Sequence, residues 1–497
     1  MGGGPPFDPL RVQPGIHPAP TLPLVGPPLV GVPMSSSTPR PAETWGTSAS
    51  MEASRPLAGL ALLALGACSL TFLIGLPVAL TYTDQFTLLR EWGITLQHLR
   101  PIHESCAFAW VFIGGVTTAH LWLIHAHGPP DSAMRKRIIA MVALWTTAGV
   151  GIVTSLMGGH FTGREYLGYS PVFSTLIVLG WLLFAWNFYS RVGWNLKGLP
   201  VYVIMWWVAI PLFLLTYAEA HAYLLEYVSL RPLRDLAIQW KSAGAHVGSF
   251  NLLAYGSLMF VASALQKNED YAHSRTAFAF FTVGLLNTFC NYGHHTYHLP
   301  QSAWVHWVSF IVSMLELLIL AKVFLDLGKL LKKQAASSSH PVIDGFMRSA
   351  SLWTFLMLTL SIVIAVPPLN AMLHGTHAIS AHVMGSMVGI DSMILWAAMA
   401  YLVSQAAGAD HRSLQKPSIC IAVRLINVFL FGFILVYLLR GASAGWSRYV
   451  GAAAGDHSAF VALFPPLMMV LGAGLMVSVL WVLFSWMHAL LFTRKPA

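Results

Sequence analysis

Charged residues are scarce in this sequence: Asp, Glu, Lys and Arg make up 9% of its 497 positions, whereas hydrophobic residues make up 56%. A soluble globular domain carries about 25% charged residues, so that class of protein is excluded. Basic residues outnumber acidic ones by 28 to 19, yet no basic cluster occurs outside the expected loops. The excess is therefore attributed to the positive-inside bias of membrane proteins, and no nucleic-acid partner is expected.

Cysteine is equally scarce. The four cysteines, Cys68, Cys106, Cys290 and Cys420, are scattered through apolar segments. Their spacing provides neither a CxxC pair nor a CxxCH motif. A disulfide framework and a covalently attached c-type haem are therefore excluded.

The N-terminal residues 1–54 have little charge and no long apolar run. They are rich in Pro, Gly, Ser and Thr, a composition that predicts a disordered tail. A signal peptide is not expected, because no basic start is followed by an apolar core and a small-residue cleavage site. Met51 lies directly before the first long apolar run, which leaves a later translation start open.

In place of charge, the sequence has long apolar runs from residue 55 onward. About twelve of them have roughly 20 residues or more, enough to cross a bilayer. They lie near 56–82, 102–127, 137–159, 170–190, 200–223, 236–265, 275–297, 303–328, 350–370, 378–405, 418–439 and 460–491. This pattern predicts an all-α polytopic membrane domain of twelve transmembrane helices over 55–497. With the N-terminus inside, roughly seventeen Lys and Arg fall on the inner side against about seven outside, so both termini are expected to be cytoplasmic.

Polar side chains gather in one apolar stretch, residues 291–316. His294 and His295 lie near the end of one predicted helix, and Glu316 lies in the next with no basic residue within a helical turn. Because unpaired polar groups are costly in a membrane, a histidine pair with a buried acid indicates a metal site with a proton supply. In the alternative interpretation, the pair caps the helix end and Glu316 bonds to a neighbouring helix.

Further histidines lie inside other predicted helices. His103 is in the second helix and His246 is in the middle of the sixth. The tenth helix carries His374, His377, His382 and Met384. Two residues on an α-helix are about 200° apart, so His382 and Met384 point to nearly opposite sides and one helix could hold two prosthetic groups. Histidine and methionine both bind haem iron, although methionine is also a common packing residue.

Together these residues resemble the catalytic subunit of the haem-copper oxidase superfamily and, within it, the bacterial nitric oxide reductases. The resemblance covers nearly all of 55–497 in helix count and motif order. It implies two b-type haems. The low-spin haem would be bound by His103 and Met384, with His377 as the alternative second ligand, and the high-spin haem by His382. The family's three histidine ligands of a non-haem metal correspond to His246, His294 and His295.

Three features separate NO reduction from O2 reduction within this superfamily. Oxygen reductases have a tyrosine cross-linked to a metal-binding histidine, but the two places where the link could form here hold Phe250 and Thr288. The segment Ser313-Met314-Leu315-Glu316 resembles the nitric oxide reductase motif that places a glutamate beside the active site. Gly163-Arg164-Glu165-Tyr166 resembles that group's GREY element, whose glutamate helps hold a calcium ion between haem propionates, which implies this role for Glu165.

The sequence also departs from the family pattern. Nitric oxide reductases have a second glutamate four residues after the sixth-helix histidine, where Phe250 stands here. Three imidazoles without a carboxylate suit copper at least as well as iron, so the metal is expected to be copper or iron. The calcium element lacks a second acid three residues after Glu165, where Gly168 stands. Glu316 is expected roughly 20 Å below the start of its helix, against roughly 7 Å for His295, so it is predicted to be a proton donor.

The resemblance implies a membrane nitric oxide reductase that converts two NO, two electrons and two protons into N2O and water. A terminal oxygen reductase is the alternative, and a twelve-helix transporter without haem is a third possibility from another class. The electron donor is expected to be a small partner subunit, a soluble cytochrome or cupredoxin, or quinol. The expected location is the bacterial inner membrane.

Overall fold

The computed structural model describes residues 55–81, 87–290, 292–296, 299–335, 340–406, 416–451 and 458–492. Within these ranges the chain is helical and has no strand. Eleven of the described helices are long and apolar enough to cross a membrane. The tail predicted at 1–54 lies outside the described residues.

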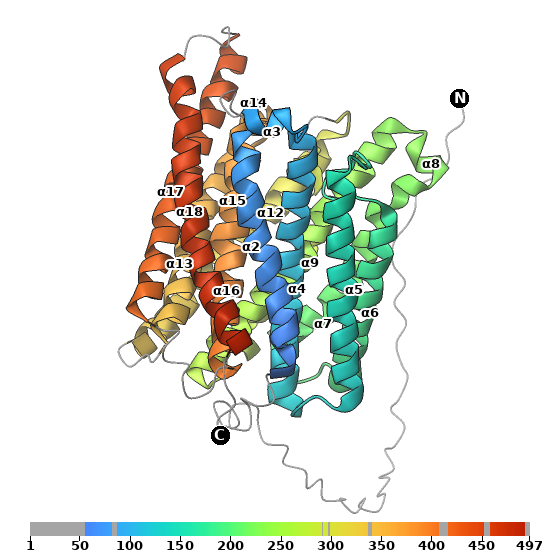
Figure 1. The fold of residues 1–497 in the computed structure, drawn as a ribbon, viewed down its shortest axis with the longest axis vertical. Helices are drawn as coiled ribbons and strands as arrows, with labels where there is room; N and C mark the ends of the chain where they lie inside the picture. Colours follow the sequence, from blue (N-terminus) through green and yellow to red (C-terminus); the bar gives the residue numbers. More distant parts are fainter. Residues whose placement is uncertain are drawn as a thin grey trace, which may run out of the picture. The chain divides into compact units, whose positions relative to one another are not determined.

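The helices follow the order of the predicted apolar runs (Figure 1). They are α2 (Ala58–Leu80), α3 (Thr87–Glu91), α4 (Leu96–His127), α5 (Ser132–Met157), α6 (Pro171–Val192), α7 (Val201–Ala220), α8 (Glu226–Ser229), α9 (Pro232–Gln266), α10 (Arg275–Cys290), α11 (Tyr292–His295), α12 (Ala303–Ala335), α13 (Pro341–Ala365), α14 (Pro367–Leu373), α15 (His377–Ser386), α16 (Met393–Ala406), α17 (Pro417–Val450) and α18 (Ser458–Phe492). The run expected at 275–297 is divided between α10, with 16 residues, and the short α11. The all-α multi-pass membrane architecture is thereby confirmed, with eleven membrane-length helices in the described residues, close to the twelve that were predicted.

Prolines mark the starts of several helices. α6, α9, α13, α14 and α17 each have proline in the first helical turn, where its missing N–H would have no helical partner in any case. α13 accordingly begins at Pro341 and not near 350. The apolar pattern placed this start too late, because the first turns of α13 carry polar residues such as Asp344 and Arg348.

Three segments form the centre of the helical bundle. In the most apolar stretches of α4, α9 and His377–Ala406, 83%, 89% and 89% of the residues are buried, against 28% in α5. These central segments carry His103, His246 and His382. Around them, α2 packs against both α4 and α18, so the first and last long helices lie side by side (Figure 1).

The tenth predicted helix is not a continuous α-helix. Between α15 and α16 the segment Met387–Ser392 is π-helical. The Ser392 hydroxyl donates a hydrogen bond to the Met387 carbonyl at 2.7 Å and accepts one from the Trp110 indole of α4 at 2.9 Å. Such π-helical turns occur often at functional sites, so this one indicates that the functional site lies in the middle of the bundle.

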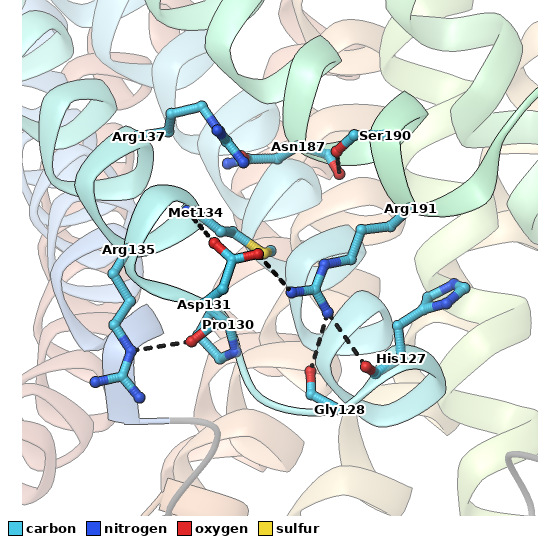
Figure 2. Close-up of polar contacts among 10 residues, drawn as sticks. All are labelled: His127, Gly128, Pro130, Asp131, Met134, Arg135, Arg137, Asn187, Ser190 and Arg191. Atoms are coloured by element: carbon cyan, nitrogen blue, oxygen red, sulfur yellow. Dashed lines mark hydrogen bonds and ion pairs between the residues drawn. The ribbon is translucent and has the colours of Figure 1, made fainter.

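A cluster of paired polar groups joins the α4–α5 turn to the end of α6 (Figure 2). The Arg191 guanidinium donates to the carbonyls of His127 and Gly128 at 3.2 and 3.4 Å, and contacts the Asp131 carboxylate at 3.4 Å. Asp131 caps α5 by accepting a hydrogen bond from the Met134 N–H at 2.7 Å. This N–H, together with the charge of Arg191, holds the pKa of Asp131 below its usual range.

The same cluster continues into the buried interior. Arg137 Nε donates to Asn187 Oδ1 at 2.5 Å, and Asn187 Nδ2 lies 3.1 Å from His120 Nε2. Asn187 and His120 are fully buried, and every polar atom of His120 has a partner because its Nδ1 bonds to the Val116 carbonyl at 2.9 Å. The set His120, Asp131, Arg137, Asn187 and Arg191 is called the α4–α5 clasp below. It satisfies its buried polar groups within the protein.

Candidate active site

The predicted ligand histidines lie deep in the bundle but keep accessible surface. His103, His246, His295 and His382 are surrounded by protein atoms. All four are nevertheless half-buried, while residues next to them, including Ile102 and Ala381, are fully buried. Imidazoles deep in an apolar bundle are groups that could bind a metal or a haem iron.

His103 on α4 has one ring nitrogen fixed by a hydrogen bond and the other without a hydrogen-bond partner among the described residues. Its Nδ1 lies 2.9 Å from the Thr71 carbonyl of α2. A carbonyl oxygen only accepts hydrogen bonds, so Nδ1 carries the proton and Nε2 presents its lone pair for a metal. A Cβ atom at Gly75 would come within 3.1 Å of the His103 ring, so only glycine leaves the ring in this position without displacement. The donor chemistry of His103 therefore fits the predicted role of a haem ligand.

His246 on α9 is oriented by a hydroxyl group of α7. Its Nδ1 lies 2.9 Å from Thr216 Oγ1, and that hydroxyl gives its own proton to the Leu212 carbonyl at 2.9 Å. The imidazole must therefore donate from Nδ1, which leaves the Nε2 lone pair for a metal. Five aromatic rings surround His246 at centroid distances of 5.1 to 6.4 Å: Phe108, Phe112, Phe213, Tyr217 and Phe250. They limit its rotation and exclude water.

His382 and Met384 share α15, which is α-helical through Ser386. The rotation of about 200° between them is therefore retained. His382 Nδ1 lies 3.4 Å from the Ser361 hydroxyl of α13, and Met384 is partly buried against the core. The alternative ligand His377 packs its ring against Tyr437 and Phe464, at 5.3 and 5.1 Å.

His295 on α11 stacks its ring parallel to Trp240 of α9, with centroids 6.1 Å apart and an interplanar angle of 4°. It lies within electrostatic range of His382 and His374. His294 belongs to the same short helix, but its side chain lies outside the described residues. Among the side chains that are described, no three of the His, Cys, Asp or Glu groups lie close enough to hold a metal ion. The set of His246, His294 and His295 thus stays a prediction.

Glu316 on α12 is buried, with 8% of its surface exposed. Its carboxylate accepts a hydrogen bond from the Asn287 amide of α10, and Asn287 Oδ1 accepts one from the Ser313 hydroxyl at 3.1 Å. This is the bond to a neighbouring helix that the alternative interpretation required. The carboxylate also lines a cavity of about 10 Å³ between α9, α10 and α12, so it combines a fixed position with access to a small molecule such as water.

Glu165 lies in the loop between α5 and α6. The Arg100 guanidinium of α4 forms ion pairs with both Glu165 and Glu104, the latter at 2.7 Å. Burial, followed by the negative charges of Glu165 and Glu104, raises the pKa of the adjacent Tyr166. Carboxylate oxygens are the donors that calcium prefers, but in this structure Arg100 already neutralises both of these carboxylates. Calcium binding by Glu165 remains a prediction.

Sequence reasoning missed several features of this site. Asn287 and Glu316 are far apart in the sequence and meet only because α10 packs against α12. Thr216 likewise reaches His246 through the packing of α7 on α9. A short polar residue in an apolar helix is the one signal that would have singled them out, and many such residues only bond to their own helix.

The chain belongs to the cytochrome c and quinol oxidase polypeptide I family, whose model matches residues 58–493. It is therefore a multi-pass membrane oxidoreductase of the haem-copper oxidase superfamily, a class that binds haems and a copper or related metal and acts on a gas. A solved structure of a haem-copper terminal oxidase dimer is similar, with a TM-score of 0.71, 14% sequence identity, and coverage of 90% of this chain and 85% of that one. At this identity the likeness shows the shared fold. No curated protein sequence matches the chain.

Proposed function

We propose that the protein is a nitric oxide reductase, which joins two NO molecules into N2O with two electrons and two protons. The observation that carries this proposal is Glu316, a buried carboxylate held by Asn287 beside a water-sized cavity. Joining two NO molecules consumes protons in a dry interior, and a carboxyl group in this position can deliver them.

The absence of a tyrosine at the usual positions supports the same reaction. Phe250 is 1% exposed and packs its ring against Phe112 and Phe108, at 4.3 and 4.7 Å. Thr288 bonds to the carbonyl of Gly284 on its own helix at 3.0 Å. Neither side chain can supply an electron. NO reduction needs two electrons per N2O, which metal groups provide without help from a side chain.

The predicted site residues would have separate roles in this reaction. His103 and Met384 would bind the low-spin haem, and His382 would bind the high-spin haem. The non-haem copper or iron would be bound by His246, His294 and His295. When bound, these groups supply electrons and attract NO. The protein fixes His246 through Thr216, keeps water away with the aromatic rings around that histidine, and brings protons through Glu316. Glu165 would add a calcium ion near the haem propionates.

The membrane setting of the proposal follows from the charges. Arg135, Lys136 and Arg137 begin α5, at the end of the bundle that we assign to the cytoplasmic side of a bacterial inner membrane. Electrons would come from a small partner subunit or from a soluble cytochrome or cupredoxin at the opposite side.

One observation favours oxygen reduction as a second candidate. The ring of Tyr217 on α7 stacks on His246, with centroids 5.8 Å apart and an interplanar angle of 26°. Its hydroxyl donates to the Ser174 hydroxyl at 3.0 Å, and Ser174 Oγ lies 2.8 Å from His221 Nε2. A phenol beside a metal-ligating histidine, with a nearby base, could supply the further electron and proton that O2 reduction needs.

The proposal is tested by supplying NO without oxygen to the purified protein and a small-molecule reductant. One N2O for every two NO consumed is expected, with reduced b-type haem bands in the absorption spectrum. A His246→Ala variant is expected to lose the non-haem metal and N2O formation while keeping both haems. Loss of the low-spin haem in that variant would contradict the assignment of His246.

A further inference from the structure

Three consecutive basic residues, Arg135, Lys136 and Arg137, lie in the first turns of α5, at the end of the bundle where α4 ends. Arg135 and Lys136 are exposed, and Arg137 is half-buried. In the part of the chain that the structure describes, none of the three forms an ion pair with a carboxylate. Their charges are therefore available to a negatively charged group from outside the protein.

Both arginines are oriented through the same atom of the guanidinium group. Arg135 Nε donates to the Pro130 carbonyl at 3.1 Å, and Arg137 Nε donates to Asn187 Oδ1 at 2.5 Å (Figure 2). Neither guanidinium makes a further hydrogen bond to the described residues. Each arginine thus has a fixed direction and keeps its two terminal nitrogens for an outside acceptor. A planar fork of this kind matches two oxygens of a phosphate group.

An exposed aromatic ring lies beside one of these cations. Trp186 near the end of α6 is 62% exposed, and the guanidinium carbon of Arg137 is 5.1 Å from the centre of its ring. Tryptophan at the end of a membrane-spanning helix is typical of the headgroup region of a bilayer, because its ring is both apolar and polar. The cation–π contact therefore places charge and interfacial aromatic surface side by side.

Apolar side chains continue from this ring toward the middle of the membrane. Leu182 and Leu179 are each 46% exposed and share the Trp186 face of α6, because the spacings are four and three residues. Ile139 on the adjoining α5 is 68% exposed. We call these four residues the α5–α6 face. Only 28% and 33% of the apolar stretches of α5 and α6 are buried, so the α5–α6 face can reach lipid.

The length of α5 places the arginines at the right depth for a lipid headgroup. Its 26 residues span about 39 Å, against about 30 Å for the hydrocarbon core of a bilayer. Its first turns therefore lie in the headgroup region while Ile139 reaches the acyl chains. This end of the bundle is also the one assigned to the cytoplasmic side, where anionic lipids attract basic residues.

We propose that Arg135 and Arg137 bind the headgroup phosphate of an anionic phospholipid whose acyl chains lie on the α5–α6 face. An anionic lipid is favoured over a zwitterionic one, because residues 128–137 contain three cations and a single carboxylate, Asp131, which Arg191 already pairs. The site goes beyond the proposed function and does not depend on it, since it requires neither haem nor gas.

The test counts the lipids that stay bound to the purified protein in native mass spectrometry, with phosphatidylglycerol or phosphatidylcholine of the same acyl chains. The wild type should bind phosphatidylglycerol at least about fivefold more tightly, and the double variant Arg135→Gln/Arg137→Gln should lose this preference. Lys267→Gln/Arg275→Gln is the matched control, because it removes two exposed charges where α9 ends and α10 begins, at the same end of the bundle. Equal losses in the two double variants would overturn the site.

Trp186→Ala tests the same site without removing a bond of the clasp. It should weaken phosphatidylglycerol binding by roughly threefold, whereas Trp304→Ala on α12, where the ring is 65% exposed, should not. No loss in Trp186→Ala would count against the α5–α6 face.

Two measurements on the wild-type protein do not depend on the folding of any variant. Equal affinity for phosphatidylglycerol and phosphatidylcholine would contradict the proposal. Glycerophosphoglycerol, which has the headgroup without acyl chains, should not displace the lipid at equal concentration, because it has no apolar contact with the α5–α6 face. Displacement by this soluble compound would identify a site for free phosphate esters and would overturn the lipid assignment.

Discussion

Polar groups have different surroundings in the α4–α5 clasp and in the middle of the bundle. In the clasp, Arg137 binds Asn187, and Arg191 contacts Asp131 (Figure 2). Asn187 also contacts His120. In the middle of the bundle, the carboxylate of Glu316 has one amide partner and lines a cavity. A group whose polar atoms are all paired holds helices together, whereas a carboxylate that also borders a cavity is available to exchange protons.

This difference predicts which buried polar residues contribute to stability and which contribute to turnover. Removing a member of the clasp leaves its partner unsatisfied and should reduce stability. Removing an acid from the middle of the bundle should reduce turnover and leave the helices in place. The following substitutions test that division.

Glu316→Gln is expected to have the largest effect. The amide keeps the size of the side chain and a hydrogen bond to Asn287 but cannot carry the proton, so N2O formation should fall by about a hundredfold with haem spectra unchanged. Glu269→Gln is the control, because this carboxylate accepts the Tyr202 hydroxyl at 2.5 Å in the loop after α9. Turnover of Glu316→Gln within about twofold of the wild type would remove Glu316 from the mechanism.

Thr216→Val tests a paired group that serves the site. Valine cannot accept the Nδ1 proton of His246, so the affinity for the non-haem metal should fall by at least about tenfold, measured by metal analysis after dialysis against a chelator. Thr216→Ser should restore binding. Thr354→Val is the matched control, because this buried hydroxyl bonds to the Ala350 carbonyl of its own helix. Equal metal loss in both valine variants would indicate a general loss of structure.

Gly75→Ala should displace His103, because the added Cβ would lie 3.1 Å from its ring. We expect a shifted absorption band of the low-spin haem and a slowing of electron entry by roughly a few-fold. Gly66→Ala on the same helix meets no atom within 4 Å and should leave both unchanged. An unaltered spectrum in Gly75→Ala would argue against His103 as the axial ligand.

Asn187→Leu should affect stability and not turnover. It leaves Arg137 and His120 without their partner, which should lower the free energy of unfolding by about 1–3 kcal/mol, observed as earlier thermal loss of the haem spectrum. Ser190→Ala, at the edge of the same cluster, removes a bond of 3.3 Å to the Asn187 carbonyl and should have a smaller effect. Slower turnover in intact Asn187→Leu protein would mean that the clasp takes part in the reaction.

The sequence predicted the helices well because apolar length is the physical requirement for crossing a membrane. α9 spans Pro232–Gln266 where 236–265 was expected, and α4 extends the expected run to Leu96. The division of 275–297 and the π-helical turn at Met387–Ser392 were not predicted. A π-helical turn depends on local hydrogen bonding, and it has no characteristic spacing of apolar residues that could be recognised in the sequence.

The candidate site was predicted only in part, for a similar reason. His103, His246 and Glu316 could be proposed from the sequence because polar residues in apolar runs are conspicuous. Their partners Thr71, Thr216 and Asn287 belong to other helices, and pairing between distant helices follows from packing that a single sequence does not encode in any short pattern.

The most direct test of the account compares gases in one preparation of the purified protein with the same reductant. NO loss and N2O gain are recorded without oxygen, and O2 uptake is then recorded without NO. A nitric oxide reductase should form N2O rapidly and take up O2 only slowly, and Tyr217→Phe should leave the rate of N2O formation unchanged. Rapid O2 uptake that Tyr217→Phe abolishes, without N2O formation, would contradict it and identify an oxygen reductase.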